Sequence, residues 1–235
     1  FAANLGYEFN ERNIANLNFQ LTNNDFTSYA DRIITNFRAD PATVNIERDE
    51  IPTEDNSWEI GGDYMHVFEN GSRWRTLFIV NEDKTDELRD RLKIDGATVT
   101  KDLFLANYVN TQERIIRSSY VFNLGDSLSV EAGVERAQTI LDTSLQLGLL
   151  DTDADALPSD PRFGGLSPVT DANGNVEELR YEYFAINNWQ INDRMSLETT
   201  LLFEESEISQ SGDVSRSRSF TFFRPKIDYR FDITP

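Results

Sequence analysis

The chain of 235 residues contains no cysteine and only one histidine, His66. Without cysteine it can form neither disulfides nor a thiolate metal site, and a cysteine nucleophile is excluded. A catalytic triad or a zinc site would depend on His66 as its single imidazole, which argues against most hydrolase and metalloenzyme functions. We therefore expect no enzymatic activity, no cofactor and no metal site.

Basic residues are scarce relative to acidic ones. The chain has 22 Lys and Arg against 41 Asp and Glu, a formal net charge of −19. Binding to a nucleic-acid backbone requires a surplus of clustered Lys and Arg, and no basic run occurs in the sequence. Nucleic acid is therefore not an expected partner.

Long apolar runs are also missing. Hydrophobic residues make up 39% of the chain, and no stretch approaches the roughly 20 apolar residues of a transmembrane helix. A transmembrane β-strand remains compatible, because only every second residue faces lipid. The first residues, Phe1 to Asn4, lack the basic and apolar regions of a signal peptide. We expect that a signal was removed or that the chain begins within a longer protein.

Apolar and polar residues alternate with a period of two in successive segments, which predicts β-strands that each have one apolar face. The clearest example runs from 223 to 233, and the whole chain predicts an all-β protein of about nine strands. The apolar rows include Leu5 and Tyr7; Leu17, Phe19 and Leu21; Trp58, Ile60 and Tyr64; Trp74, Phe78 and Val80; Tyr120 and Phe122; Val130 and Val134; Tyr181 and Tyr183; Leu197, Leu201 and Phe203; and Phe223, Ile227, Tyr229, Phe231 and Ile233.

The connections between these segments are alternately short and long. Short turns with Asn, Asp or Gly lie at 11–13, 70–72, 123–126 and 192–194, and longer polar connections lie at about 35–56, 82–100, 146–179 and 204–217. Outer-membrane β-barrels have short periplasmic turns and longer extracellular loops, whereas structureless loops of this length argue against a compact soluble domain. The pattern predicts an antiparallel transmembrane β-barrel segment.

The acidic charge is concentrated in the four long connections. They hold eight Lys or Arg and 23 Asp or Glu, which is −15 of the net −19, so the acidity is expected on the cell-exterior side. Part of this charge, Asp151, Asp153 and Asp155, has the spacing of a calcium loop. Ala156 and Arg162 stand where that loop needs glycine and glutamate, so a solvated acidic loop is favoured.

Two sets of strand residues are candidates for functional contacts. The first set would sit at the membrane interface, where aromatic residues are enriched: Trp58, Trp74, Trp189, Tyr229 and Phe231. The second set alternates with the apolar rows and would face the barrel lumen, where it could contact a ligand or a plug or simply fill a polar interior by pairing across strands: Arg73, Arg75, Glu198, Arg224, Lys226, Asp228 and Arg230.

The segment Phe222-Phe223-Arg224-Pro225-Lys226-Ile227-Asp228-Tyr229-Arg230-Phe231-Asp232-Ile233-Thr234-Pro235 resembles a mid-barrel strand of TonB-dependent outer-membrane receptors. The hairpin from Trp189 to Leu197 is similar to the strand, periplasmic turn and returning strand of that family. The resemblance implies a 22-strand barrel, a plug domain, contact with TonB through that plug and uptake of a scarce nutrient.

The sequence also departs from this family. It shows no plug or energy-coupling box, about nine strands are counted instead of 22, and Thr234-Pro235 replaces a closing aromatic residue. We therefore expect residues 1–235 to be a partial outer-membrane barrel domain. It would form an open, curved sheet, because the first and ninth strands run in the same direction and cannot pair in an antiparallel barrel.

Three functions remain open at this point. The leading one is the wall and extracellular loops of a TonB-dependent transport barrel that takes up an unknown small ligand. The alternatives are a structural or adhesive outer-membrane barrel and a soluble carbohydrate-binding β-sandwich. For the last strand we predict Phe223, Ile227, Tyr229 and Phe231 on lipid, with Pro225 near the outer end of the strand because it lacks a backbone donor.

Overall fold

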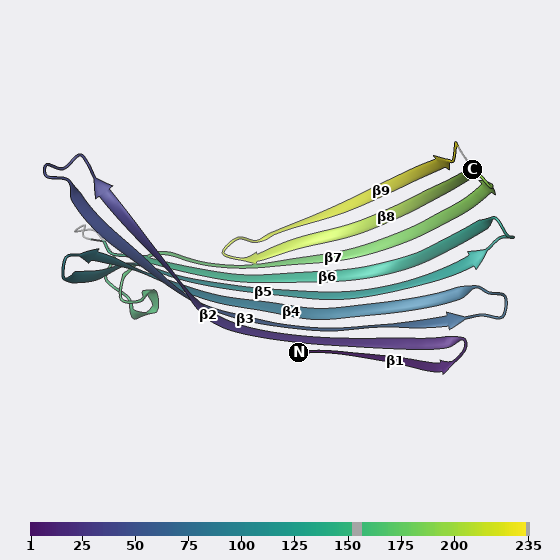
Figure 1. Cartoon of the computed structure of the whole chain (residues 1–235), viewed down its shortest axis with the longest axis horizontal. Coiled ribbons are helices and arrows are strands. Elements are labelled where there is room, and N and C mark those ends of the chain that lie inside the picture. Colours follow the sequence, from purple (N-terminus) through teal and green to yellow (C-terminus); the bar gives the residue numbers. More distant parts are fainter. Residues whose placement is uncertain (152–156, 234–235) are drawn as a thin grey trace.

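The computed structural model describes residues 1–151 and 157–233, and they form one antiparallel sheet of nine strands in sequence order. Figure 1 shows the strands side by side as a long, curved layer. The all-β fold and the count of nine strands are confirmed. The strands are β1 (Ala2–Asn10), β2 (Asn13–Asn36), β3 (Thr43–Val67), β4 (Arg73–Asp95), β5 (Thr98–Asn123), β6 (Leu128–Leu149), β7 (Ser167–Asn192), β8 (Met195–Gly212) and β9 (Arg216–Phe231).

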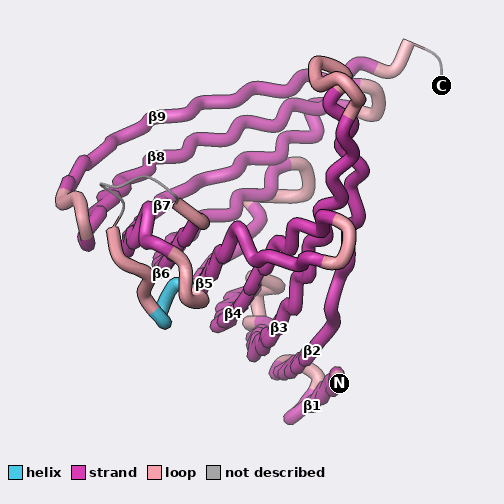
Figure 2. Tube along the Cα trace, turned by 90° about the vertical axis from the view of Figure 1, so that its left-hand side faces the viewer, coloured by secondary structure: helices cyan, strands magenta, loops and turns pink. Residues whose placement is uncertain are grey.

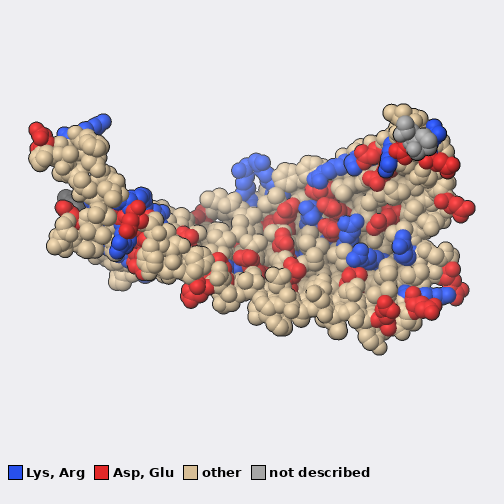
Figure 3. Space-filling view, in the orientation of Figure 1, with Lys and Arg blue, Asp and Glu red and all other residues tan. Residues whose placement is uncertain are grey.

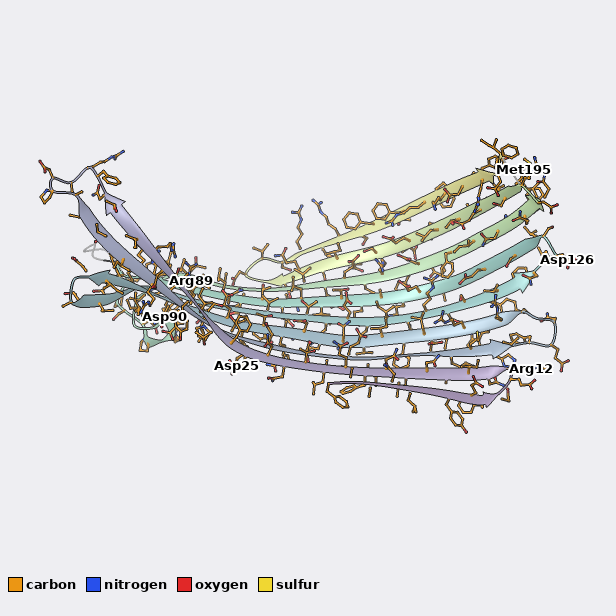
Figure 4. The ribbon with its side chains drawn as sticks, in the orientation of Figure 1. Arg12, Asp25, Arg89, Asp90, Asp126 and Met195 are labelled. Atoms are coloured by element: carbon orange, nitrogen blue, oxygen red, sulfur yellow. The ribbon has the colours of Figure 1, made fainter. Side chains whose placement is uncertain are left out.

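The four short turns lie where the sequence predicts them, at one end of the sheet. Three of them begin with an asparagine whose side-chain oxygen accepts a hydrogen bond from the backbone two residues later, at Asn10, Asn70 and Asn192. Such Asx turns reverse the chain within a few residues. In Figure 4, Arg12, Asp126 and Met195 mark this end, and Arg89 and Asp90 lie toward the opposite end.

The long polar connections predicted as loops are mostly strand, so that part of the prediction is wrong. The β2–β3 and β4–β5 connections shrink to residues 37–42 and 96–97, and the β8–β9 connection to 213–215. These segments are polar on both faces, so they lack the period-two apolar signal that reveals a half-buried strand. Cross-strand ion pairs hold them instead, such as Arg48 with Asp31 at 2.8 Å.

The β6–β7 connection keeps more irregular structure. A short 3-10 helix, η1 (Pro161–Phe163), begins after Asp160, whose side chain accepts a hydrogen bond from the Arg162 backbone. Phe163 is almost fully buried against β6, where Gly148 leaves room for it. The acidic residues Asp153 and Asp155, part of the predicted loop, lie outside the described residues.

The sheet is open, as predicted. β1 and β9 each have a single neighbour, and Figure 2, viewed nearly along the strands, shows the sheet as an arc with β1 and β9 at its two ends. A β-sandwich needs two packed sheets, and the described residues form only one, so the soluble sandwich alternative is wrong. No helix in the described ranges is long and apolar enough to cross a membrane.

Pro225 lies opposite Leu201 and well inside β9, not near the outer end of the strand. The prediction fails because β9 continues to Arg216. The missing backbone donor is tolerated because β9 is an edge strand of this sheet.

Candidate functional site

The strand register separates the side chains of the sheet into two faces. In an antiparallel pair, residues directly opposite each other share a face. From Ile227 on β9 the register leads through Thr199, Asn187 and Val130 to Phe122 on β5. Following it across every strand shows that the predicted apolar rows share one face, and the polar rows share the other.

The apolar rows form a continuous band across all nine strands. On β3 the band runs from Trp58 to His66, nine residues whose eight steps correspond to about 26 Å along a strand. On the side of the long hairpins, charged residues end the band at Glu82, Arg114, Arg136 and Glu205, each the next residue on the same face. We call this surface the apolar band.

Most large apolar side chains of this band are exposed, and the others are half-buried. Ile227 is 69% exposed, Ile116 is 54% exposed and Val134 is 48% exposed. Among the described residues, only Ala137, Phe163, Leu166 and Phe184 are buried apolar residues. This distribution is the reverse of a water-soluble domain, in which the largest contiguous apolar surface is buried.

The predicted interface aromatics lie at the edges of the apolar band. Trp74 and Trp189 lie near the short turns, and Trp58 lies at the opposite edge. The ring nitrogens of two of them donate hydrogen bonds, from Trp58 to Glu82 at 3.0 Å and from Trp74 to Ser118 at 2.8 Å. The remaining two, Tyr229 and Phe231, face the same side as Trp189. Their contact with a membrane interface stays a prediction.

His66 belongs to an aromatic cluster at the short-turn edge of the band. It lies opposite Trp74, its Nδ1 is 2.7 Å from the Asn13 side-chain oxygen, and its ring packs edge-on against Phe68. Phe68 in turn packs against Tyr120. The structure therefore places His66 on the apolar face near a short turn.

The polar face is more crowded than the apolar face. Ser119, Phe184, Glu204 and Ser206 are buried and belong to the polar rows. Side chains on the inner side of a curved sheet converge, so their crowding indicates that the polar rows line the concave side. In Figure 3 positive and negative side chains lie interspersed over the strands.

Three of the predicted lumen residues, Glu198, Lys226 and Asp228, meet on β8 and β9. Lys226 forms an ion pair with Asp228 and lies 3.9 Å from Glu198. Arg224 pairs with Glu204 at 2.7 Å. The remaining residue on β9, Arg230, pairs with Asp232 at 3.1 Å. These charges form a patch of three separate ion-paired groups on the polar face.

Arg73 and Arg75 lie apart from these ion-paired groups. They lie on β4, and four strands separate them from β9, which corresponds to about 24 Å at the usual strand spacing. Arg75 is 3.4 Å from Asp63 on β3. The sequence prediction treated both groups as one lumen set, and the structure resolves it into two separate groups.

Two further residues extend the polar row of β9 toward the long hairpins. Arg216 and Arg218 share the face of Arg224 and are exposed. Within the described ranges neither has an ion-pair partner. The same period-two alternation could have identified them, but they lie at the edge of a segment expected to be a loop.

The carboxylate of Asp49 anchors the base of the projecting β2–β3 hairpin. This role was not predicted from the sequence. Asp49 is 2% exposed and pairs with Arg89 at 2.9 Å and with Arg32. Burial raises the pKa of the Asp49 carboxyl, but the hydrogen bonds from both arginines outweigh it and hold the pKa below its usual value. In Figure 4, Arg89 lies where the strands cross at this end.

The comparisons with known proteins give a limited result. No family model and no curated protein matches the chain. A crystal structure of the ferric citrate transporter FecA in the unliganded form is similar over 99% of this chain and 41% of that chain, with 12% sequence identity and a TM-score of 0.42. The chain therefore spans about two fifths of the length of that transporter.

Proposed function

We propose that the sheet is part of the wall of an outer-membrane β-barrel. The observation that carries this proposal is the apolar band, an exposed apolar surface that crosses all nine strands and faces away from the charged side. A transmembrane barrel presents an apolar band about 25 Å tall to lipid and a polar interior to its lumen. The band along β3 has the corresponding height.

The strand ends support the same orientation. Short turns close one edge of the sheet and hairpins extend far beyond the band at the other, which matches periplasmic turns and extracellular extensions. The projecting hairpins hold most of the net negative charge. Charged residues of this kind are stable in water and costly in lipid, so they belong outside the membrane.

We further propose a role in transport, not in catalysis. The charged concave face would line the path of a small ligand or contact a plug, and the motifs at Trp189 to Leu197 and Phe222 to Pro235 support a receptor that works with TonB. Phe220 and Phe222, stacked at 6.0 Å beside Arg216 and Arg218, add an aromatic surface to this path. A structural or adhesive barrel is the alternative, favoured by the long acidic hairpins.

Two adjacent threonines on β8 allow a matched test of this membrane placement. Thr199 lies opposite Ile227 on the apolar face and Thr200 lies opposite Lys226 on the polar face. The chain has no cysteine, so Thr199→Cys and Thr200→Cys each introduce a single thiol. In outer membranes, a water-soluble maleimide should label Thr200→Cys, and Thr199→Cys should react only after unfolding.

The transport role needs a separate measurement. Deletion of the full-length gene should reduce uptake of the small ligand that the barrel transports. In the undeleted strain, the gene product should fractionate with the outer membrane. Equal labelling of both cysteine variants in intact membranes would contradict the membrane placement. Normal uptake in the deletion strain, with the labelling pattern retained, would favour the structural or adhesive alternative.

A further inference from the structure

Two arginines lie side by side at the hairpin edge of the apolar band. Arg114 on β5 lies opposite Gln138, and Arg136 on β6 lies opposite Ile116. The two arginines are therefore diagonal neighbours on one face, with Cβ atoms about 7–8 Å apart. Both project from the apolar face, and we call them the rim arginines.

Arg136 has no carboxylate among the residues directly opposite it. Its neighbours across the strands are Ile116 and Tyr181, and its guanidinium donates only to Gln138, at 3.4 Å. Arg114 likewise donates to Gln112 at 3.2 Å. Within the described ranges, neither rim arginine forms an ion pair.

The carboxylate closest to Arg114 in the register is already engaged. Glu82, at the band edge of β4, accepts hydrogen bonds from Trp58 at 3.0 Å and Gln112 at 3.1 Å and pairs with Lys84 at 3.0 Å. Nearby arginines on the polar face differ, because Arg117 on β5 and Arg180 on β7 both pair with Glu135 on β6. The apolar face therefore presents two guanidinium groups that form no ion pair with the described residues of the sheet.

An apolar hollow lies on the same face, next to Arg136. It measures about 480 Å³, and Val134, the outward residue that follows Arg136 toward the short turns, forms part of its wall. Two small residues on opposite strands, Ala132 and Ala185, leave this space open. Its other outward lining residues are large and apolar: Tyr183, Leu201, Phe203 and Phe223.

We propose that the rim arginines bind the phosphate group of a membrane lipid whose acyl chain occupies this hollow. This inference rests on the membrane placement proposed above and adds a specific lipid partner, in the leaflet on the side of the long hairpins. Guanidinium groups bind phosphate oxygens through paired hydrogen bonds. A cation at the edge of the hydrocarbon region either extends to the water interface or binds an anion at the level of the lipid headgroups.

Native mass spectrometry of the full chain in detergent tests this proposal with dioleoyl phosphatidic acid as the probe. Dioleoylglycerol lacks the phosphate, and inorganic phosphate lacks the chains. We expect retention of phosphatidic acid only, and an apparent dissociation constant at least about tenfold higher for the double variant Arg114→Gln/Arg136→Gln. Arg117→Gln, which removes a guanidinium from the opposite face of β5, should retain the lipid like the wild type.

The hollow is tested by Ala185→Leu, which narrows it without changing a charge. This variant should weaken retention of phosphatidic acid, and the Arg114→Lys/Arg136→Lys variant should retain more lipid than the Gln variant. Equal retention by the wild type and the Gln variant, or equal retention of dioleoylglycerol, would overturn the proposal. Competition by millimolar inorganic phosphate to the same extent as by lipid would mean a free-anion site instead.

Arginine labelling of the wild type covers the case in which the Gln variant does not fold. Phenylglyoxal should modify Arg114 and Arg136 less in vesicles that contain phosphatidic acid than in vesicles that contain dioleoylglycerol, with Arg117 unchanged. Equal modification in both would overturn the lipid site. If the Thr199→Cys and Thr200→Cys labelling still shows the membrane pattern, that failure concerns the lipid site alone and leaves the proposed barrel intact.

Discussion

At the scale of single residues, one position along a strand decides whether a side chain faces the apolar band or the charged face. Ile227 and Asp228 are adjacent on β9, and their cross-strand partners are Thr199 and Glu198. A slip of one residue would exchange the two faces along the whole strand. The facing of this strand could be predicted from its uninterrupted alternation.

Ile227→Arg should destabilise the folded protein in lipid vesicles by about 2–4 kcal/mol, because a lipid-facing charge near the bilayer midplane carries that cost. Asp228→Asn should cost much less, since Asp228 is exposed on the polar face beside Lys226. Unfolding titrations of both variants measure the difference. Equal costs, or a larger cost at Asp228, would reverse the assigned faces.

Asp49→Asn should loosen the β2–β3 hairpin, by about 1–3 kcal/mol, because it leaves Arg32 and Arg89 without their shared carboxylate. The folded-state pKa of Asp49 lies below its usual value of about 3.9, so its stabilising effect is complete above that pH and is lost as the pH falls through the lower folded-state pKa. Hydrogen exchange of hairpin amides, measured as the pH is lowered through the folded-state pKa of Asp49, follows this loss.

The Asn variant should show a smaller pH dependence of hairpin protection than the wild type. Some dependence should remain, because the hydrogen bond from Arg48 lowers the pKa of Asp31 in the same hairpin. If both proteins lose hairpin protection in parallel, Asp49 does not anchor the hairpin.

At the scale of elements, the strands differ in how clearly the sequence reveals them. The portions inside the apolar band, such as Phe223 to Phe231, alternate strictly and were predictable. The projecting portions of β2, β3, β4 and β5 are held by cross-strand charges, such as Arg91 with Asp102 at 2.8 Å. No single-strand pattern reveals such pairs, because each depends on a register between segments.

Gly133 on β6 shows how neighbouring strands share the crowded face. A Cβ at this position would lie 2.4 Å from Phe184 Cζ and 2.6 Å from the Ser118 carbonyl oxygen. Gly133→Ala should therefore displace Phe184 and cost about 1–3 kcal/mol in vesicle unfolding titrations. Gly6→Ala, where the nearest atom is the Asn16 side-chain oxygen at 3.1 Å, should cost less than about 0.5 kcal/mol, and equal costs would contradict this packing.

At the scale of the whole molecule, the nine strands form an arc whose two edges run in the same direction. An antiparallel barrel that includes this sheet therefore needs an odd number of further strands between β9 and β1. The number of strands and the open shape of the sheet could be predicted from the alternation of apolar and polar residues and from the turns. The separation of the charge groups on β4 and on β8–β9 could not be predicted, since their distance depends on the strand order and spacing.

The three tryptophans can report whether the apolar band faces lipid, because all of them lie on that face. Variants that keep one of Trp58, Trp74 or Trp189, with the other two changed to Phe, should be placed in vesicles of lipids brominated near the headgroup or near the chain ends. We expect quenching of all three, stronger with shallow than with deep bromines. Fluorescence that neither lipid quenches would contradict contact between the band and lipid.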